Sequence, residues 1–193
     1  MGNIYTDKNA INEAEMYNER GLKLIESGQL SEAIHNFNKA VEIDSDLVKA
    51  YNNRGLAKRI SGNYSGAIED FTRAINKNHN FAQAYNNRGV AKRMSGGCSS
   101  AIEDFTKAIK IDLNFAKAYK NRGIAKSDLG DKTSAIIDFT KAIEIDPNFA
   151  EAYYDRGIAK CLLGDKNGSC ADWLKAAELG YKKAWTPIKR HCQ

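Results

Sequence analysis

Residues 116–149 read AKAYKNRGIAKSDLGDKTSAIIDFTKAIEIDPNF, and most of the chain consists of copies of this stretch. The phrase Tyr-x-x-Arg-Gly occurs in five copies, and its glycines stand 34 residues apart each time. These glycines are Gly21, Gly55, Gly89, Gly123 and Gly157. A fixed period of this length, without insertion or deletion, indicates an array of stacked repeats. We therefore treat the 193 residues as one repeat array rather than as one or two ordinary domains.

Each copy contains two helical patterns separated by a glycine. In the second copy, Val48, Tyr51 and Gly55 recur at helical spacing, and Ala67 and Phe71 do so in its second half. Between the halves stand Gly28, Gly62, Gly96, Gly130 and Gly164, one in each copy. Glycine adopts the left-handed conformation in which a chain leaves a helix. The pattern predicts an all-α chain of antiparallel helix pairs.

Short polar residues mark the predicted helix starts. For the first helices the N-cap candidates are Asp46, Asn80, Asn114 and Asn148. For the second helices two sets remain open. One set is Ser31, Ser65, Ser99, Thr133 and Asn167, and the other, two residues earlier, is Asn63, Asp131 and Asp165. Asp44, Asp112 and Asp146 recur at the repeat ends, and we interpret them as cap or turn residues.

Small residues recur where the two helices of a pair would cross. The glycine of each Tyr-x-x-Arg-Gly phrase is matched by alanines such as Ala67 and Ala74 in the second helix. A side chain larger than methyl would push two close backbones apart. Aromatic residues supply bulk beside the crossing, namely Phe37, Phe71, Phe105, Phe139 and Trp173. We interpret this set as core, because one pair alone cannot cover its apolar surface.

The pattern of Tyr, Gly, Gly, Ala, Phe and Ala at these offsets closely resembles the tetratricopeptide repeat (TPR) family, over about residues 14–180. The resemblance implies a right-handed superhelical solenoid of antiparallel helix pairs. The expected boundaries are an N-terminal tail or helix extension (1–13), five repeats (14–47, 48–81, 82–115, 116–149 and a divergent 150–181) and a C-terminal capping helix (182–193).

The chain departs from the family pattern in an arginine just before the first glycine of every repeat. A buried guanidinium needs a carboxylate. Aspartates recur at the same period, as Asp70, Asp104, Asp138 and Asp172, with Asn36 in the first repeat. We expect structural Arg–Asp pairs that bridge the two helices of a repeat, or neighbouring repeats.

The resemblance also implies that the first helices line a concave groove that receives peptides. The candidate residues there are Lys49, Asn52, Asn53, Arg59, Asn86, Asn87, Arg93, Lys117, Lys120 and Asn121. A carboxamide offers a donor and an acceptor together, as an extended peptide backbone does. The series Asn53, Asn87 and Asn121 resembles the asparagine ladder of some peptide-binding TPR proteins. The alternative is that these amides only solvate the helix or contact a neighbour.

Charge refines this expectation. The basic candidates lie in the middle of the chain, flanked by Glu15, Glu19, Glu26, Asp128, Glu151 and Asp155. That arrangement favours a ligand that is acidic in its middle. The carboxylate clamp of chaperone-binding TPR proteins is not expected, because its ninth-position asparagine is replaced by Leu22, Leu56, Val90, Ile124 or Ile158, and its arginine is missing.

Nothing in the sequence points to catalysis. His35, His79 and His191 are scattered, and no nucleophile, zinc or phosphate-binding motif occurs. We expect neither enzyme activity nor a cofactor or metal. Cys98, Cys161, Cys170 and Cys192 lack zinc-site spacing, so we expect free thiols of a reducing compartment, and Cys170 with Cys192 is the one pairing worth testing.

The most favoured function is therefore a protein-interaction scaffold that binds an extended segment. Two alternatives remain, a self-assembling structural scaffold and a weak binder of nucleic acid or membrane driven by the net charge of +5 and the basic C-terminal segment. No apolar run reaches the length of a membrane span. We expect a cytoplasmic protein, with membrane association only if Gly2, which fits a myristoylation pattern with Thr6, is lipidated.

Overall fold

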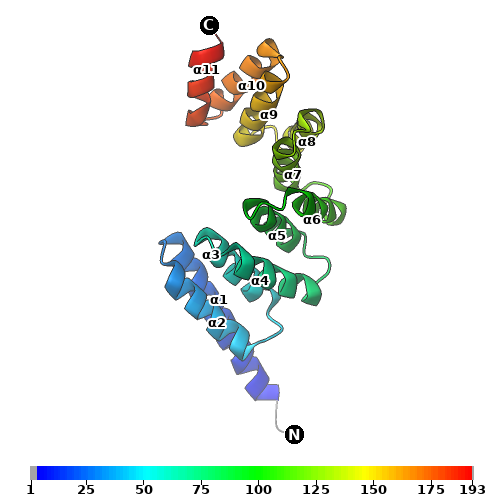
Figure 1. Ribbon diagram of the computed structural model, residues 1–193. Helices are drawn as coiled ribbons and strands as arrows, with labels where there is room; N and C mark the ends of the chain where they lie inside the picture. Colours follow the sequence, from blue (N-terminus) through cyan, green and yellow to red (C-terminus); the bar gives the residue numbers. More distant parts are fainter. Residues whose placement is uncertain (1–3, 193) are drawn as a thin grey trace. The chain divides into compact units, whose positions relative to one another are not determined.

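The computed structural model describes residues 4–192, and all of its regular secondary structure in that range is helical (Figure 1). The chain divides after Gly96 into two compact units. The first unit holds α1 (Ile4–Glu26), α2 (Leu30–Ile43), α3 (Val48–Ile60), α4 (Tyr64–Lys77) and α5 (Ala82–Met94). The second holds α6 (Cys98–Ile111), α7 (Ala116–Asp128), α8 (Lys132–Ile145), α9 (Ala150–Leu162), α10 (Lys166–Glu178), the 3₁₀ helix η1 (Lys182–Ala184) and α11 (Trp185–His191).

Within each unit, every helix packs on the next one along the chain. In the first unit α1 packs on α2 and α3 on α4, and the second helix of each pair also contacts the first helix of the following pair. The first helices touch one another as well, α1 with α3 and α3 with α5. The second unit repeats this arrangement from α6 to α10. Because α1 already begins at Ile4, the described part of the 1–13 segment extends the first helix.

The predicted glycine turns are confirmed. Gly28, Gly62, Gly96, Gly130 and Gly164 all have φ between 77° and 92°, and they are joined by Gly180 at 87°. In this left-handed region a side chain is strained, whereas glycine is not. Each first helix therefore stops within two residues of its glycine, and the short connection makes the following helix antiparallel.

The expected N-caps of the first helices are wrong. Leu47, Phe81, Phe115 and Phe149 occupy the cap position and make no side-chain cap bond. Asp46, Asn80, Asn114 and Asn148 stand one residue before these caps, and their backbone N–H groups donate to Asp44, Asn78, Asp112 and Asp146. The loop carboxylates and amides thus close a turn two residues long. Asp44, Asp112 and Asp146 are both turn residues and the C-cap residues of α2, α6 and α8, the two roles expected for them.

At the second helices, the structure selects the earlier of the two candidate sets. The side chains of Asn63, Asp131 and Asp165 accept from the backbone N–H groups of Gly66, Ser134 and Gly168. These bonds satisfy one of the N–H groups that have no partner within the helix. The bond to Ser134 lowers the pKa of the Asp131 carboxyl. The serines and threonine of the later set do not act as caps.

The core consists of an aromatic ring and alanines contributed by successive helices. Phe71 of α4 is fully buried and packs with Ala67 of its own helix and Ala91 of α5. In the second unit Phe139 and Ala135 pack in the same way with Ala159. The crossing residue Gly55 faces the Phe71 ring rather than the alanines, since a Cβ placed on it would lie 2.8 Å from Cε1 of that ring. The aromatic ring therefore fills the space that the glycine leaves.

Replacing Gly55 with alanine should lower the free energy of unfolding by up to about 2 kcal/mol. Alanine favours a helix over glycine by about 1 kcal/mol, but displacing the buried Phe71 ring costs about 1–3 kcal/mol. Urea denaturation followed by circular dichroism measures the difference. Ser65→Ala, at an exposed position of α4, is the control and should cost nothing. A variant about 1 kcal/mol more stable than the wild type would show that the ring shifts without penalty, because only the helix preference of alanine would remain.

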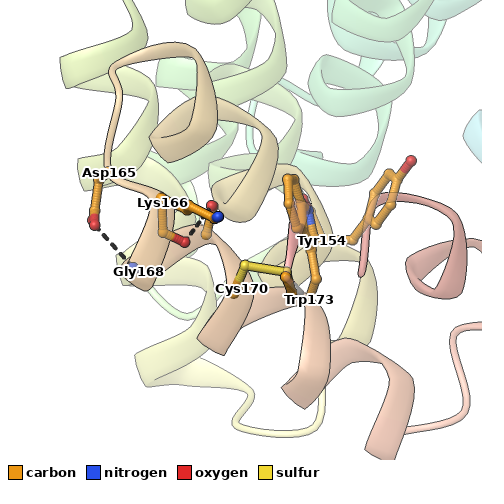
Figure 2. Close-up of a disulfide and its surroundings, with 8 residues drawn as sticks. Tyr154, Asp165, Lys166, Gly168, Cys170 and Trp173 are labelled. Atoms are coloured by element: carbon orange, nitrogen blue, oxygen red, sulfur yellow. Dashed lines mark hydrogen bonds between the residues drawn. A yellow bond between two sulfur atoms is a disulfide. The ribbon is translucent and has the colours of Figure 1, made fainter. Parts of the chain in front are cut away.

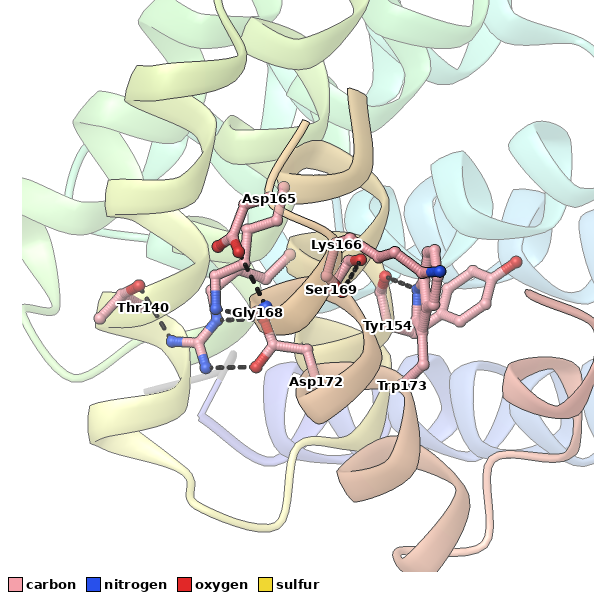
Figure 3. Close-up of polar contacts among 10 residues, drawn as sticks. Thr140, Tyr154, Asp165, Lys166, Gly168, Ser169, Asp172 and Trp173 are labelled. Carbon is pink, nitrogen blue, oxygen red and sulfur yellow. Dashed lines mark hydrogen bonds and ion pairs between the residues drawn. The ribbon is translucent and has the colours of Figure 1, made fainter. Parts of the chain in front are cut away.

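The predicted Arg–Asp pairs are confirmed at Arg54–Asp70, Arg122–Asp138 and Arg156–Asp172. Each guanidinium donates two bonds of 2.6–2.9 Å to both oxygens of the aspartate in the second helix of the same repeat. Its remaining nitrogen donates to the preceding repeat, to Asn38, Thr106 or Thr140. Figure 3 shows the last of these networks, with Asp172 and Thr140 on either side of the guanidinium. One arginine thereby joins three helices of two repeats.

The C-terminal end is closed by a disulfide between Cys170 of α10 and Cys192, just after α11 (Figure 2). The expectation of free thiols is therefore wrong for this pair, whereas Cys98 and Cys161 are free. The sequence could not decide the question because proximity of two cysteines 22 residues apart depends on how α11 folds back. Trp173 and Ala184 form a buried cluster there, against which Ile188 packs. Most of the apolar face of α10 is thus covered.

Candidate functional site

A chain of carboxamides runs across the first helices of the first unit. Asn53 donates to Asn18 of the preceding repeat at 2.9 Å, and Asn87 donates to Asn52 at 3.0 Å. Asn52 in turn donates to Asn53 at 3.3 Å, and Gln83 donates to Asn87 at 3.2 Å. Five amides from α1, α3 and α5 are therefore linked head to tail. Each bond between repeats joins residues 35 positions apart, which is one repeat plus one residue.

This row of hydrogen-bonded amides shows that the candidate asparagines in it bond to one another rather than standing free for a ligand. Asn52, Asn86 and Asn87 are buried, with 4–8% of their surface exposed, whereas Asn53 and Asn121 are half-buried. Amides that bond to the neighbouring repeat couple the repeats, which was the alternative left open by the sequence. Each primary amide has two donor hydrogens and two acceptor sites, so Asn53 keeps one of each beyond its bonds to Asn18 and Asn52. Among the linked asparagines, only Asn53 is not buried, so it is the most accessible of them for peptide contact.

The basic candidate Arg59 stands out in the first unit. It lies near the end of α3, and its Nε is buried without a hydrogen-bond partner in the described part of the chain. Burial lowers the pKa of the Arg59 guanidinium, and the nearby Tyr64 only partly offsets this. A buried donor on a cation that lacks an acceptor costs free energy until an acceptor arrives. Lys49, also on α3, is exposed, and Arg93 of α5 is half-buried.

The first helices of the second unit present a different surface. Lys117 is exposed, and the Lys120 ammonium lies 5.3 Å from the centre of the Phe149 ring. A pocket of about 170 Å³ between α7 and α9 is lined by Ile124, Phe139 and Ile158 together with the acidic Asp128 and Asp155. Burial raises the pKa of Tyr181, and Asp155 and Glu151 raise it further. Two of the acidic residues expected to flank the basic stretch, Asp128 and Asp155, thus line one pocket of this unit.

The sequence analysis did not predict the bond between Asn18 and Asn53, nor that the Arg59 Nε is buried without a hydrogen-bond partner among the described residues. Asn18 belongs to a regular series with Asn52 and Asn86 at one position of the first helix, so its period was visible. What the sequence does not show is that this series bonds to the next position in the following repeat. The distance between the two series depends on how far one first helix is displaced from the next, which is a tertiary quantity.

Neither a metal site nor a membrane-spanning helix is found among the described residues. Among the residues whose side chains are described, 11–192, no three His, Cys, Asp or Glu side chains gather in a way that could hold a metal ion. Within residues 4–192, every helix is too short or too polar to cross a membrane. The possible lipid site at Gly2 lies outside the described residues.

Sequence profiles identify the repeats. The profile described as TPR repeat matches residues 21–58 and 55–96, and two profiles described as tetratricopeptide repeat match 116–149 and 139–171. Together they cover well over half of the chain. The chain belongs to the tetratricopeptide repeat family. A search of curated protein sequences finds no significant match.

Solved TPR structures share this fold. A crystal structure of MamA is 28% identical, with a TM-score of 0.73 over 85% of this chain and 96% of that one. PilF of Pseudomonas aeruginosa is 16% identical, with a TM-score of 0.82 over 89% of this TPR chain and 78% of PilF. YrrB, whose structure is described as a TPR protein with an unusual peptide-binding site, is 21% identical, with a TM-score of 0.70 over 95% and 97% of the two chains.

Proposed function

We propose that this TPR chain is a protein-interaction module, and that the first helices of its first unit bind an extended, acidic segment of a partner protein. The observation that carries the proposal is Arg59, because its buried Nε has no acceptor among the described residues. A carboxylate is the strongest acceptor that a protein ligand offers to a guanidinium. Protein binding by TPR proteins in general, and the peptide-binding site named for YrrB, are consistent with this assignment.

The neighbouring amides suit the backbone of the same segment. Asn53 lies on α3 with Arg59, and retains one donor and one acceptor beyond its bonds within the amide chain. A strand-like peptide that bonds to Asn53 could place an acidic side chain at Arg59. Lys49, exposed on the same helix, adds a positive charge that would draw an acidic ligand toward this surface. The ligand would thus be selected by charge and held through its main chain.

Arg59→Gln should weaken binding of an acidic peptide about 10- to 100-fold, because a hydrogen bond to a charged group contributes about 1.5–3 kcal/mol. The probe is a fluorescein-labelled decapeptide of glutamate and serine, and fluorescence anisotropy at low and moderate salt gives the dissociation constants. The matched control is Arg73→Gln, which removes the same charge from an exposed site on α4.

Equal affinities for wild type and Arg59→Gln would contradict the proposal, as would equal losses in both variants, which would reveal only a general charge effect. A lysine–serine decapeptide checks the sign of the ligand and should not bind. Immobilised wild type and Arg59→Gln can then be compared in cell extract to identify the natural partner.

A further inference from the structure

In later repeats, the arginine of the Tyr-x-x-Arg-Gly phrase binds the same kinds of group each time. Arg54, Arg122 and Arg156 each hold an aspartate carboxylate through two bonds of 2.6–2.9 Å. Each also donates to an oxygen of the preceding repeat at 2.9–3.2 Å. A lysine one turn after the arginine, such as Lys58, contacts the same carboxylate. The chain itself therefore shows that this position takes a carboxylate and one further acceptor.

The first repeat has the arginine without either acceptor. The residue that corresponds to Asp70 is Asn36, whose amide donates to the backbone oxygen of Glu32 at 2.8 Å. The residue that corresponds to Lys58 is Leu24, so the whole charged network is reduced to Arg20. Arg20 is exposed, and among residues 11–192, the range in which side chains are described, it makes no hydrogen bond or ion pair. No described helix pair lies in front of α1 to supply the second acceptor.

Arg20 lines a pocket of about 620 Å³ between α1 and α2. Tyr17 and Leu24 contribute apolar surface, while Gln29, Ser31 and His35 bring groups that can donate hydrogen bonds to an anion. Glu32 is the one acidic residue of the lining, and its side chain is exposed to solvent. The pocket has room for a side chain with its backbone, and its strongest binding group is a guanidinium without a carboxylate.

The apolar surface beside Arg20 is also uncovered. Met16, one turn before Arg20, is 55% exposed, whereas Ala50, Ala84, Ala118 and Ala152 at the same position of later repeats are fully buried. In those repeats a preceding second helix packs on the first helix, as α2 does on α3. An apolar residue of a ligand would cover Met16 in the same way.

We propose that the α1–α2 pocket binds a second, separate segment of a partner protein, with an Asp or Glu carboxylate on Arg20 and an aliphatic side chain against Met16. This occupant follows from the later repeats, in which the equivalent arginine pairs with a carboxylate, as Arg54 does with Asp70. Arg20 lacks that carboxylate, so an acidic side chain of the partner would supply it. The proposal is independent of the peptide surface at Arg59, because the two arginines lie on different helices and different repeats.

Asn36→Asp provides the sharpest test, because it restores within the chain the carboxylate that the ligand would bring. The probe is a fluorescein-labelled decapeptide of aspartate, leucine and serine, titrated by anisotropy into wild type, Asn36→Asp and Arg20→Gln. All titrations are repeated in Arg59→Gln protein, so that binding at the other surface is separated. The Arg20 Nε–H signal in ¹⁵N NMR spectra reports occupancy of the pocket directly.

The expected result is at least a tenfold weaker affinity in both Asn36→Asp and Arg20→Gln, with a shift of the Arg20 signal in the wild type. The loss should persist in the Arg59→Gln background. Arg20→Gln keeps the test valid if Asn36→Asp does not fold, because Arg20 is exposed. Unchanged affinity in either folded variant, no binding by the wild type, or equal binding of the peptide with asparagine in place of aspartate would overturn the proposal. A wild-type dimer that Asn36→Asp abolishes, without peptide binding, would also overturn it, since the occupant would then be a second copy.

Discussion

Replacing Asp70 with alanine is expected to lower the free energy of unfolding by about 3–5 kcal/mol, the cost of removing one partner from a buried ion pair. Asp70 is only 1% exposed, and it accepts from Arg54 at 2.6 and 2.9 Å and from Lys58 at 2.7 Å. Its removal leaves the buried Arg54 guanidinium without a counter-charge. The effect should extend to the preceding repeat, because Arg54 also bonds to Asn38.

Urea denaturation of Asp70→Ala, followed by circular dichroism, measures this loss. Glu69→Ala is a matched control, since Glu69 is the adjacent carboxylate on α4 and is exposed. It should change stability by less than about 0.5 kcal/mol. The double variant Arg54→Met/Asp70→Leu should recover part of the loss, because a buried pair replaced by apolar residues is often neutral. A loss below about 1 kcal/mol in Asp70→Ala would contradict a structural role for the pair.

Replacing Cys170 with serine is expected to destabilise the C-terminal end by about 3 kcal/mol, according to the loop-closure entropy of a crosslink of this length. The disulfide joins residues 22 positions apart and ties α11 to α10. The helix α11 has only seven residues, too few to be stable alone in water. Without the crosslink, α11 should therefore open more often and expose the cluster around Trp173. In a reducing compartment the wild type should behave like the variant.

Amide hydrogen exchange provides a local measurement for this prediction. Exchange in residues 185–191 should accelerate in Cys170→Ser and Cys192→Ser, and in reduced wild type, while exchange in α7 and α8 stays unchanged. Cys98→Ser is the control, because Cys98 is free and lies on α6. Protection of α11 that is the same with and without reductant would mean that packing on Trp173 and Ala184 alone holds this helix in place.

The two arginine sites differ in how the sequence could have revealed them. The departure at Asn36 is visible as a break in the series Asp70, Asp104, Asp138 and Asp172, so the sequence alone marks the first repeat as unusual. At Arg59 no series is broken, because Arg93 occupies the same position in the next repeat. Only the atomic surroundings show that the Arg59 Nε is buried without an acceptor among the described residues.

The sequence by itself determined the elements that depend on contacts within one repeat. The turn at Gly62 requires a left-handed residue, and the Arg54–Asp70 pair joins two helices connected by that single short turn. Residues 16 positions apart across such a turn have little freedom to miss each other. The helix pairs, their repetition and the ion pairs therefore follow from the 34-residue period.

The tertiary structure decided everything that depends on how one helix lies against a helix of another repeat. Polar residues occur at several positions near each helix start, and the sequence did not show that Leu47 would take the N-cap position while the Asp46 N–H donates to Asp44. The bond between Asn53 and Asn18 and the disulfide of Cys170 with Cys192 likewise depend on displacements of a few ångströms between helices. Periodicity specifies which residue types recur along the chain. The displacement of one helix against another results from side-chain packing across their interface, and this displacement decides which residues touch.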